Sequence, residues 1–370
     1  MEHDMRIIVL VDAPTGGAGN IAQLLAGELA KEGNEVTLLF TSQHTMDKRY
    51  SMPNVTCGIV NLSVSGFGKL RRTKIQVDKL RKSLQEYRPE LVICFLGQLV
   101  AFAGMASIGA PWRLIACERN DPKREPLRLS ANIMRFIGYC RSDSVSVQFK
   151  HYGEIYGSLF KKKCCVTPNY INTPTRTKSY EPKESSRKIR FISLGRIVPQ
   201  KNFESMVDLF QRVHSLRRET ELHIYGDGSL GGSTERKLVD LIKKKAIDDA
   251  VVLHGPTKAP YDVLADSDIY LMTSKYEGFP NALCEAMAVG LPCVAFECHK
   301  GLHEIVDNRV NGFLIDRNDQ EAFVNCCIEL IDDATLRKTM GEQAKNLPNR
   351  FSKSAVTQSW KDCIRHAMGY

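Results

Sequence analysis

The sequence predicts an α/β protein with two Rossmann-like, doubly wound domains that face a central cleft. Short apolar runs alternate with helix-like segments, an alternation typical of a parallel sheet whose two faces are covered by helices. The alternation stops at a polar stretch in mid-chain and then starts again. A chain of 370 residues is also too long for one simple core and suits two domains.

The first alternation predicts an N-terminal domain over residues 1–170. A strand at 7–11 leads through a glycine-rich turn into a helix that ends at Gly33. The further elements expected here are a strand at 36–40, a basic helix near 69–86, and strands at 91–95, 113–117 and 144–149. In sheets of this kind, ligands bind beyond the carboxyl ends of the strands, in loops that run into helices.

A linker and a second domain are expected to follow. Residues 171–188 contain two prolines and few apolar side chains, so we interpret them as a linker. Residues 189–350 predict a C-terminal domain, and residues 351–370 predict a helix that packs back toward the N-terminal domain. The elements expected in the C-terminal domain are strands at 190–194, 221–226, 251–255, 268–274 and 292–296, helices at 203–217, near 233–245 and around Glu285, and helical structure after Gln320.

Residues 91–112 carry no charged side chain and are long enough to be considered as a transmembrane helix. The segment also contains three glycines, Gln98 and Pro111. We therefore expect a buried strand, a short turn and an apolar helix that ends near Gly109. A signal peptide is not expected, because the first residues run directly into the first strand.

The twelve cysteines are scattered along the chain, and none forms a CxxC pair or a spacing typical of a zinc site. Several lie inside expected strands, including Cys94 and Cys117. We therefore expect reduced thiols that serve as small apolar side chains in a cytoplasmic protein.

The positive charge of the chain is concentrated in its first half. The first 180 residues contain 25 Lys and Arg against 15 Asp and Glu, whereas the rest contain 26 against 27. This excess predicts an anionic partner for the N-terminal domain. Nucleic acid, an anionic membrane surface and a phosphorylated substrate are the candidates.

The basic residues gather at 68–88 and at Lys161–Lys163. In a helix, Val77, Leu80 and Leu84 would form one apolar stripe. The basic side chains on the other faces would be Lys69, Arg71, Arg72, Lys74, Lys79, Arg81 and Lys82. Either the stripe faces the core and the basic side is solvated, or the helix contacts an anionic membrane. Nucleic-acid binding is not expected, because aromatic residues are not interleaved with the cations.

The turn after the first expected strand has the sequence DAPTGGAGN. Gly16 and Gly17 would let the backbone approach a ligand at the start of a helix, although a plain tight turn also explains them. The full GxGxxG fingerprint is absent, so NAD is not expected.

Two loops of the C-terminal domain carry candidate ligand contacts. In the loop GRIVPQKN, Gly195 follows a strand, and Arg196 and Lys201 are cations suited to a diphosphate, unless they are ordinary surface charges. The next strand ends in a turn at Gly226 and Asp227 that could lie against a ligand. His254, after the following strand, is either a structural histidine or a ligand contact.

The segment YEGFPNALCEAMAVGLPCVAF at 276–296 raises the question of what its two glutamates hold. Pro280 suits the first turn of a helix, whose free N–H groups at Asn281 to Leu283 would form an anion site. Glu285 shares a face with Asn281, and its carboxylate can accept two hydrogen bonds from a diol such as a ribose. Glu277 would contact the group on the far side of the phosphates from the ribose. The order ribose, diphosphate and further polar group predicts a sugar nucleotide.

These motifs resemble the family-4 retaining glycosyltransferases of the GT-B fold. The resemblance rests on the glycine pair near the N-terminus, GRIVPQKN, GDG, the 276–296 block and NGFLI at 311–315. The sequence CERNDP at 117–122 is similar to a loop found in a subgroup that builds bacterial glycans and capsules, including N-acetylgalactosamine transferases.

The resemblance implies roles for the candidate residues. Glu285 would bind the nucleotide ribose, Glu277 the hydroxyls of the donor sugar, and Arg196 and Lys201 the diphosphate. The segment that would wrap the sugar and phosphates consists of Gly278, Phe279, Pro280, Asn281, Ala282 and Leu283. Family members need no metal ion, and the UDP-sugar is a co-substrate, so no cofactor is expected.

The sequence departs from the family pattern in one loop of the N-terminal domain. Many relatives carry a histidine there, whereas this chain has Glu118 and Arg119. These two residues are candidates for the acceptor or sugar side of the site.

The expected function is retaining transfer of an N-acetylhexosamine or hexose from a UDP-sugar to a growing, lipid-linked glycan of a bacterial surface polysaccharide or glycoconjugate. The expected location is cytoplasmic, peripheral at the inner face of the cell membrane. A UDP-sugar 2-epimerase-like enzyme of the same fold and a non-catalytic sugar-nucleotide-binding protein are the alternatives. The Glu277–Glu285 block argues against the epimerase, and the intact set of charged residues argues against a decayed site.

Overall fold

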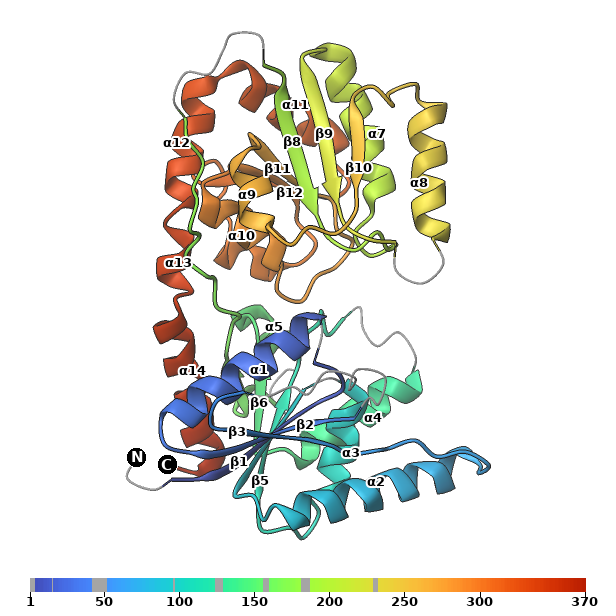
Figure 1. The fold of residues 1–370 in the computed structure, drawn as a ribbon, viewed down its shortest axis with the longest axis vertical. Helices are drawn as coiled ribbons and strands as arrows, with labels where there is room; N and C mark the ends of the chain where they lie inside the picture. Colours follow the sequence, from blue (N-terminus) through green and yellow to red (C-terminus); the bar gives the residue numbers. More distant parts are fainter. Residues whose placement is uncertain are drawn as a thin grey trace. The chain divides into compact units, whose positions relative to one another are not determined.

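The computed structural model describes residues 4–14, 16–41, 52–95, 97–123, 129–155, 160–180, 187–228 and 232–370. The chain forms two compact units, shown in Figure 1. The first unit consists of Met1–Asn169 and Ser354–Tyr370, and the second consists of Tyr170–Lys353. Each unit is an α/β fold around one parallel sheet, which confirms the predicted fold class.

The described part of the first unit contains a seven-stranded parallel sheet with the order β3-β2-β1-β4-β5-β6-β7. Its strands are β1 (Arg6–Val11), β2 (Glu35–Phe40), β3 (Val55–Ile59), β4 (Leu91–Phe95), β5 (Arg113–Cys117), β6 (Ser144–Val147) and β7 (Cys164–Val166). The strand order reverses between β1 and β4, where Val9 pairs with both Leu38 and Ile93. Such a reversal is where doubly wound sheets usually bind ligands.

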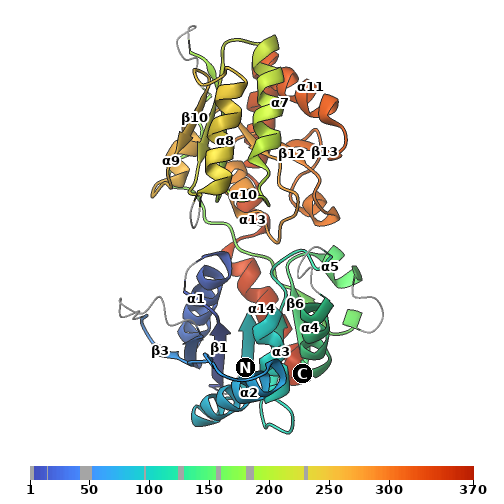
Figure 2. The same cartoon turned by 90° about the vertical axis from the view of Figure 1, so that its right-hand side faces the viewer.

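Helices cover both faces of this sheet. They are α1 (Gly16–Lys31), α2 (Lys69–Glu86), α3 (Gly97–Ala106), α4 (Leu129–Arg141), α5 (Lys150–Ile155) and α14 (Lys353–Met368). Figure 2 shows α1 and α14 on one face and α2, α3 and α4 on the other. The central strands β1 and β4 are almost entirely apolar, as expected for strands buried on both faces.

The uncharged segment at 91–112 forms the buried strand β4 and the apolar helix α3, as predicted. No helix in the described ranges combines the length and the apolar character needed to cross a membrane.

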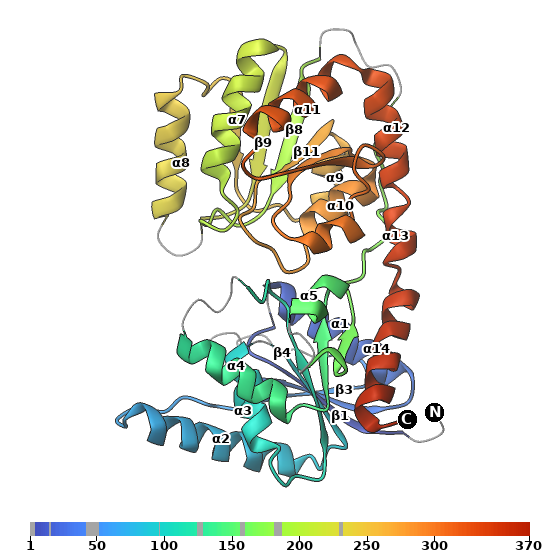
Figure 3. The same cartoon turned by 180° about the vertical axis from the view of Figure 1, so that it is seen from behind.

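The described part of the second unit contains a six-stranded parallel sheet with the order β10-β9-β8-β11-β12-β13. Figure 3 labels its strands β8, β9 and β11. Its strands are β8 (Ile189–Leu194), β9 (Thr220–Tyr225), β10 (Val251–His254), β11 (Ile269–Met272), β12 (Cys293–Phe296) and β13 (Gly312–Ile315). Its helices are α7 (Phe203–Leu216), α8 (Ser233–Lys244), α9 (Pro260–Ala265), α10 (Asn281–Val289), the 3₁₀ helix η2 (Lys300–Glu304), α11 (Gln320–Asp332), α12 (Ala334–Ala344) and α13 (Leu347–Arg350). The strand order reverses between β8 and β11.

Local sequence explains the elements of the second unit. In α7, Phe203, Met206, Val207, Phe210 and Val213 recur at helical spacing and are buried in the core. The helices α11 and α12 each begin after an aspartate whose carboxylate accepts a hydrogen bond from a backbone N–H three residues later.

Part of the segment interpreted as a linker is fixed to the second unit. The buried Lys178 ammonium lies 2.6 Å from the Asp268 carboxylate and also donates to the carbonyl of Ser267. The hydroxyl of Tyr180 donates to the carbonyl of Gly290 at 2.6 Å. Polarity alone did not reveal this, because polar side chains can be buried when partners satisfy them. Residues 181–186 lie outside the described residues.

The final helix, α14, belongs to the first unit from Ser354 onward. The Trp360 ring lies 6.1 Å from the Phe95 ring, and the Lys361 ammonium lies 2.7 Å from the Glu32 carboxylate. The chain therefore leaves the first unit after Asn169 and returns to it with its last helix.

Candidate active site

The candidate site of the second unit lies where β8 and β11 end. These strands are neighbours, so the loops at 195–202 and 273–280 meet at the same edge of the sheet. The N–H of Lys275 donates to the carbonyl of Gln200 at 2.8 Å, and the Gln200 side chain donates to the carbonyl of Tyr276 at 2.9 Å. The Thr273 hydroxyl donates to the carbonyl of Lys201 at 3.2 Å. The two loops are therefore held in one fixed arrangement.

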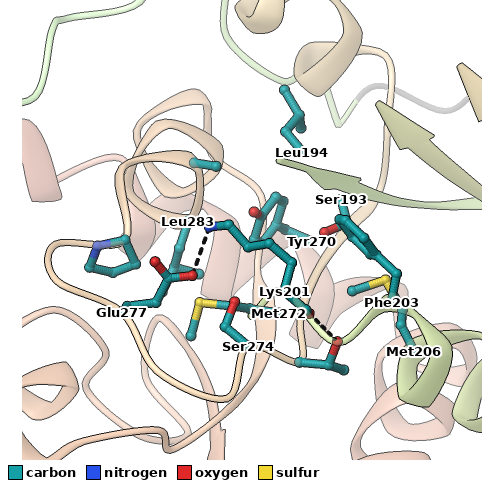
Figure 4. Close-up of a pocket in the computed structure, with 13 residues that line it drawn as sticks. Ser193, Leu194, Lys201, Phe203, Met206, Tyr270, Met272, Ser274, Glu277 and Leu283 are labelled. Carbon is teal, nitrogen blue, oxygen red and sulfur yellow. Dashed lines mark hydrogen bonds and ion pairs between the residues drawn. The ribbon is translucent and has the colours of Figure 1, made fainter. Parts of the chain in front are cut away.

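Lys201 and Glu277 are joined by this arrangement. Lys201 Nζ lies 2.7 Å from Glu277 Oε1, as Figure 4 shows. Only 5% of Glu277 is exposed, so the ammonium supplies the partner that a buried carboxylate needs. The pair lines a small pocket whose wall consists of Ser193, Leu194, Lys201, Phe203, Met206, Tyr270, Met272, Thr273, Ser274, Glu277, Pro280, Ala282 and Leu283.

Glycine is required where the loops after β8 and β9 cross. A Cβ atom at Gly226 would lie 1.9 Å from the carbonyl oxygen of Gly195. The N–H of Gly195 donates to the carbonyl of Tyr225 at 2.9 Å, and the N–H of Ile197 donates to the carbonyl of Asp227 at 2.7 Å. The GDG turn thus supports the loop that carries Arg196 and Lys201.

Arg196 is exposed, and no side chain in the described part of the chain pairs with its guanidinium. A cation held on a braced loop without an internal partner is available to an anionic ligand.

The start of α10 differs in detail from the sequence prediction. The helix begins at Asn281, and Pro280 occupies the capping position before it instead of the first turn. The N–H of Asn281 is not free, because it donates to the carbonyl of Phe279 at 2.9 Å. The N–H groups of Ala282 and Leu283 lie in the first turn, where a helix has no acceptor of its own. Both residues line the pocket.

The neighbouring residues Gly278 and Phe279 are buried, and the Phe279 ring packs edge-on against Phe351 at 5.5 Å. Phe279 therefore anchors the loop in the core of the second unit. This contact explains why the loop carries an aromatic residue between a glycine and a proline.

Glu285 lies on α10, one turn beyond Asn281, and does not line the pocket of Lys201 and Glu277. Burial raises the pKa of its carboxyl to about 7. Burial and the Glu285 charge together raise the pKa of Tyr261 of α9. Within the described residues no group donates a hydrogen bond to this carboxylate. A ligand with two adjacent hydroxyls would supply the missing donors.

His254 is part of an aromatic stack. Its ring lies parallel to the Tyr225 ring at 4.1 Å, and its Nε2 lies 3.0 Å from Nδ1 of His223. Burial, with the positive charge of Arg190, lowers the pKa of His254. These contacts favour the structural interpretation of His254.

The candidate site residues of the first unit are two exposed glycines and two buried charged residues. Gly16 and Gly17 are exposed at the start of α1, and Gly16 has a φ of +82°, in the left-handed region that favours glycine. Glu118 and Arg119 are buried, and each is held by other residues of the first unit.

The contacts of Glu118 and Arg119 are structural. Tyr139 donates to the Glu118 carboxylate at 2.7 Å. The Arg119 guanidinium donates to the carbonyl of Thr167 at 2.8 Å and lies 5.0 Å from the centre of the Trp360 ring. Arg119 therefore holds α14 on the sheet of the first unit. The sequence could not show this, because both residues follow a strand end, where ligand contacts are also found.

Four polar pocket residues were not predicted from the sequence, namely Ser193, Tyr270, Thr273 and Ser274. Ser193 and Tyr270 lie inside apolar strand runs, and a hydroxyl in such a run was the available signal. Within the described ranges, no group of three or more His, Cys, Asp or Glu side chains is placed to hold a metal ion.

The fold and this site are those of two-domain α/β proteins that bind ligands at the carboxyl ends of parallel strands. Residues 175–347 match the family described as "Glycosyl transferases group 1". The matched segment contains all six strands of the second unit's sheet and the site just described, so this similarity covers the candidate site.

Three known proteins show how far the similarity extends. The amylovoran biosynthesis glycosyltransferase AmsD of Erwinia amylovora is 24% identical, covering 97% of this chain and 99% of that protein. The N-acetylgalactosamine-N,N'-diacetylbacillosaminyl-diphospho-undecaprenol 4-alpha-N-acetylgalactosaminyltransferase of Campylobacter jejuni is 26% identical over 57% of this chain and 55% of its own length. The solved structure of HepE from Anabaena in complex with UDP-glucose is 17% identical, covers 97% of this chain and 99% of that chain, and has a TM-score of 0.82, a likeness that establishes the fold.

Proposed function

We propose that this protein is a retaining, metal-independent family-4 glycosyltransferase that transfers an N-acetylhexosamine or hexose from a UDP-sugar. The acceptor would be a hydroxyl of a growing glycan, linked to a polyprenyl diphosphate, in bacterial surface polysaccharide or glycoconjugate synthesis. The single observation that supports this most is the Lys201–Glu277 pair in its pocket, with the unsatisfied carboxylate of Glu285 one turn further along α10.

The charges of the site suit the departure of a diphosphate. Breaking the bond between the anomeric carbon and the phosphate oxygen places negative charge on the leaving group. Arg196, Lys201 and the N–H groups of Ala282 and Leu283 would stabilise this charge, because they are oriented before the reaction starts. Loss of one such donor typically costs about 2.7–4 kcal/mol in the barrier.

The two glutamates would position the donor. Glu277 would accept hydrogen bonds from hydroxyls of the sugar while it keeps Lys201 in place. Glu285 would accept two hydrogen bonds from the ribose. The departing phosphate oxygen would take the proton of the acceptor hydroxyl, so that no separate general base is required.

The names of the relatives support a lipid-linked acceptor. The Campylobacter relative is named as acting on an undecaprenol-diphosphate-linked sugar, and HepE binds UDP-glucose in its solved structure. The basic helix α2 supports a peripheral, cytoplasmic location at an anionic membrane. Its stripe of Val77, Leu80 and Leu84 is buried, and its outward side carries exposed lysines and arginines.

A nucleotide-binding experiment tests the donor class. Thermal melting would be measured with UDP, GDP, ADP and NAD, each with and without EDTA, on the wild type, on Glu285→Ala and on the exposed control Glu219→Ala. We expect a UDP-specific rise that EDTA does not change, that Glu285→Ala removes and that Glu219→Ala retains. A rise with NAD alone, or with no nucleotide, would overturn the proposal.

A product assay tests the reaction. Incubation with UDP-N-acetylhexosamine or UDP-hexose and a polyprenyl-diphosphate-linked sugar should release UDP and give a glycoside with the anomeric configuration of the donor by NMR. Conversion of the UDP-sugar without an acceptor would support the epimerase-like alternative instead.

A further inference from the structure

The helix α4 presents apolar side chains on two opposite sides. Its inner side packs on α3 so closely that a Cβ atom at Gly138 would lie 2.7 Å from Cγ1 of Val100. On its outer side Leu129, Ile133 and Phe136 have exposed fractions of 76%, 52% and 49%. Cys140, one turn further, is also exposed. These four residues recur at i, i+4, i+7 and i+11 and so form a single stripe, here called the outer stripe.

The outer stripe is not explained by the packing of the first unit. A surface helix of a globular protein normally has one apolar side, which faces the core, and α4 already buries that side against α3 and Glu118. A second apolar stripe in contact with water is unfavourable unless something covers it. The helix contains no Asp or Glu.

Cations surround the carboxyl end of the outer stripe. The Phe136 ring packs edge-on against Phe160 at 5.5 Å, and the next residues, Lys161 and Lys162, are exposed. Lys163 Nζ donates to the carbonyls of Cys140 at 3.3 Å and Ser142 at 2.7 Å. The exposed Arg141 lies at the end of the helix itself. An apolar stripe with a cationic border is complementary to a partner that has an apolar interior and anionic groups at its surface.

The basic helix α2 lies on the same side of the sheet as α4, separated from it by α3 (Figure 2). Its first residues are also apolar and basic. Leu70 is 88% exposed, and the Arg71 guanidinium lies 4.5 Å from the centre of the Phe67 ring. The apolar and cationic groups of α2 and α4 thus belong to one side of the first unit.

We propose that the outer stripe of α4 inserts into the interfacial layer of a bilayer that contains anionic lipids, while the bordering lysines and Arg141 bind lipid phosphates. Helices that lie in a membrane surface combine an apolar side with Lys and Arg in this way. A second copy of the chain fits less well. A two-fold pairing through the outer stripe would bring two cationic borders together, which is unfavourable.

The outer stripe would be the membrane-contacting element of the proposed enzyme, and its biological meaning rests on that proposed function. Membrane binding can be tested separately, because the outer stripe lies in the first unit, whereas Arg196, Lys201, Glu277 and Glu285 lie in the second. Vesicle binding can therefore be lost while UDP binding is retained, and the two proposals fail separately.

The first experiment measures co-sedimentation of the full-length protein with vesicles of phosphatidylcholine alone and with added phosphatidylglycerol. The test variant is Leu129→Gln/Ile133→Gln/Phe136→Gln, since glutamine is a good helix former. The control is Leu216→Gln/Val310→Gln, which alters two residues of the second unit that are 58% and 51% exposed. UDP-induced stabilisation is measured on every variant.

We expect the wild type and the control to bind the anionic vesicles and the test variant to bind roughly tenfold less or worse. All three should be stabilised equally by UDP. Lys161→Gln/Lys162→Gln should weaken binding to the anionic vesicles only. Equal vesicle binding by the test variant and the wild type would overturn the proposal.

The second experiment labels Cys140, which is the exposed thiol among the twelve cysteines, all of which lie in described residues. A polarity-sensitive fluorophore on Cys140 should shift its emission to the blue on anionic vesicles, and Cys140→Ser should abolish the signal. No shift would contradict insertion. A dimer in light scattering that the test variant dissociates would instead identify the outer stripe as a contact between two copies and overturn the membrane assignment.

Discussion

The ammonium of Lys201 lies 2.7 Å from the carboxylate of Glu277, although 76 residues separate them in the sequence. The pair forms because β8 and β11 are adjacent strands and because several hydrogen bonds join the loops that follow them. One contact therefore links the cation suited to a diphosphate with the carboxylate suited to a sugar.

Separating this pair should impair transfer of the sugar. Lys201→Met should lower kcat by about 100-fold or more, because a preorganised charge at the diphosphate is lost. The measurement is UDP release at saturating donor. The matched control is Lys275→Met, which removes an exposed lysine from the neighbouring loop. Equal activity of the two variants would show that Lys201 does not act on the leaving group.

The carboxyl of Glu285 should make the free energy of unfolding depend on pH. Burial raises its pKa from 4.5 to about 7 in the folded protein, so the folded state binds a proton more tightly than the unfolded state. Above pH 7 the ionised carboxylate therefore lowers the free energy of unfolding. This destabilisation disappears as the pH falls from about 7 to about 4.5.

The expected difference is at most about 3 kcal/mol between the two ends of that range. It would be measured by urea unfolding from pH 5 to pH 8 on the wild type and on Glu285→Gln, which cannot ionise. The stability of the wild type relative to Glu285→Gln should fall as the pH rises. Parallel pH profiles would contradict the raised pKa.

Gly226 should tolerate no side chain. In Gly226→Ala the new Cβ atom would collide with the carbonyl oxygen of Gly195, and the loop that carries Arg196 and Lys201 would have to move. We expect a loss of about 1–3 kcal/mol in the free energy of unfolding and weaker stabilisation by UDP. Gly255→Ala is the control, because a Cβ atom there would meet nothing within 4 Å. The idea fails if both alanine variants bind UDP like the wild type.

Lys178 should stabilise the second unit. Lys178→Met would remove one partner of a buried ion pair and leave the Asp268 carboxylate with less compensation. Breaking such a pair costs about 3–5 kcal/mol, which would appear as a lower urea midpoint. Lys258→Met, at an exposed position of the same unit, should leave the midpoint unchanged. If residues 171–188 were a linker without fixed contacts, both variants would have the same urea midpoint.

Much of the fold could be predicted because apolar periodicity is a local property. The strands at 91–95 and 190–194 and the helix at 203–217 are close to β4, β8 and α7. The strands β3, β7 and β13 were not predicted. All three are short strands at the edge of a sheet, so few residues carried a signal for them.

The sequence by itself determined the two parallel α/β sheets and the residues at the ends of their strands, because strand and helix periodicities depend only on residues that are close in the sequence. Only the tertiary structure decided which of those residues work together. It joined Lys201 to Glu277, placed His254 in a stack, buried Arg119 under Trp360 and fixed Lys178 on Asp268. It also left the outer stripe of α4 exposed. These outcomes depend on which strands and helices become neighbours, and strand order is set by packing of the whole sheet rather than by any local pattern.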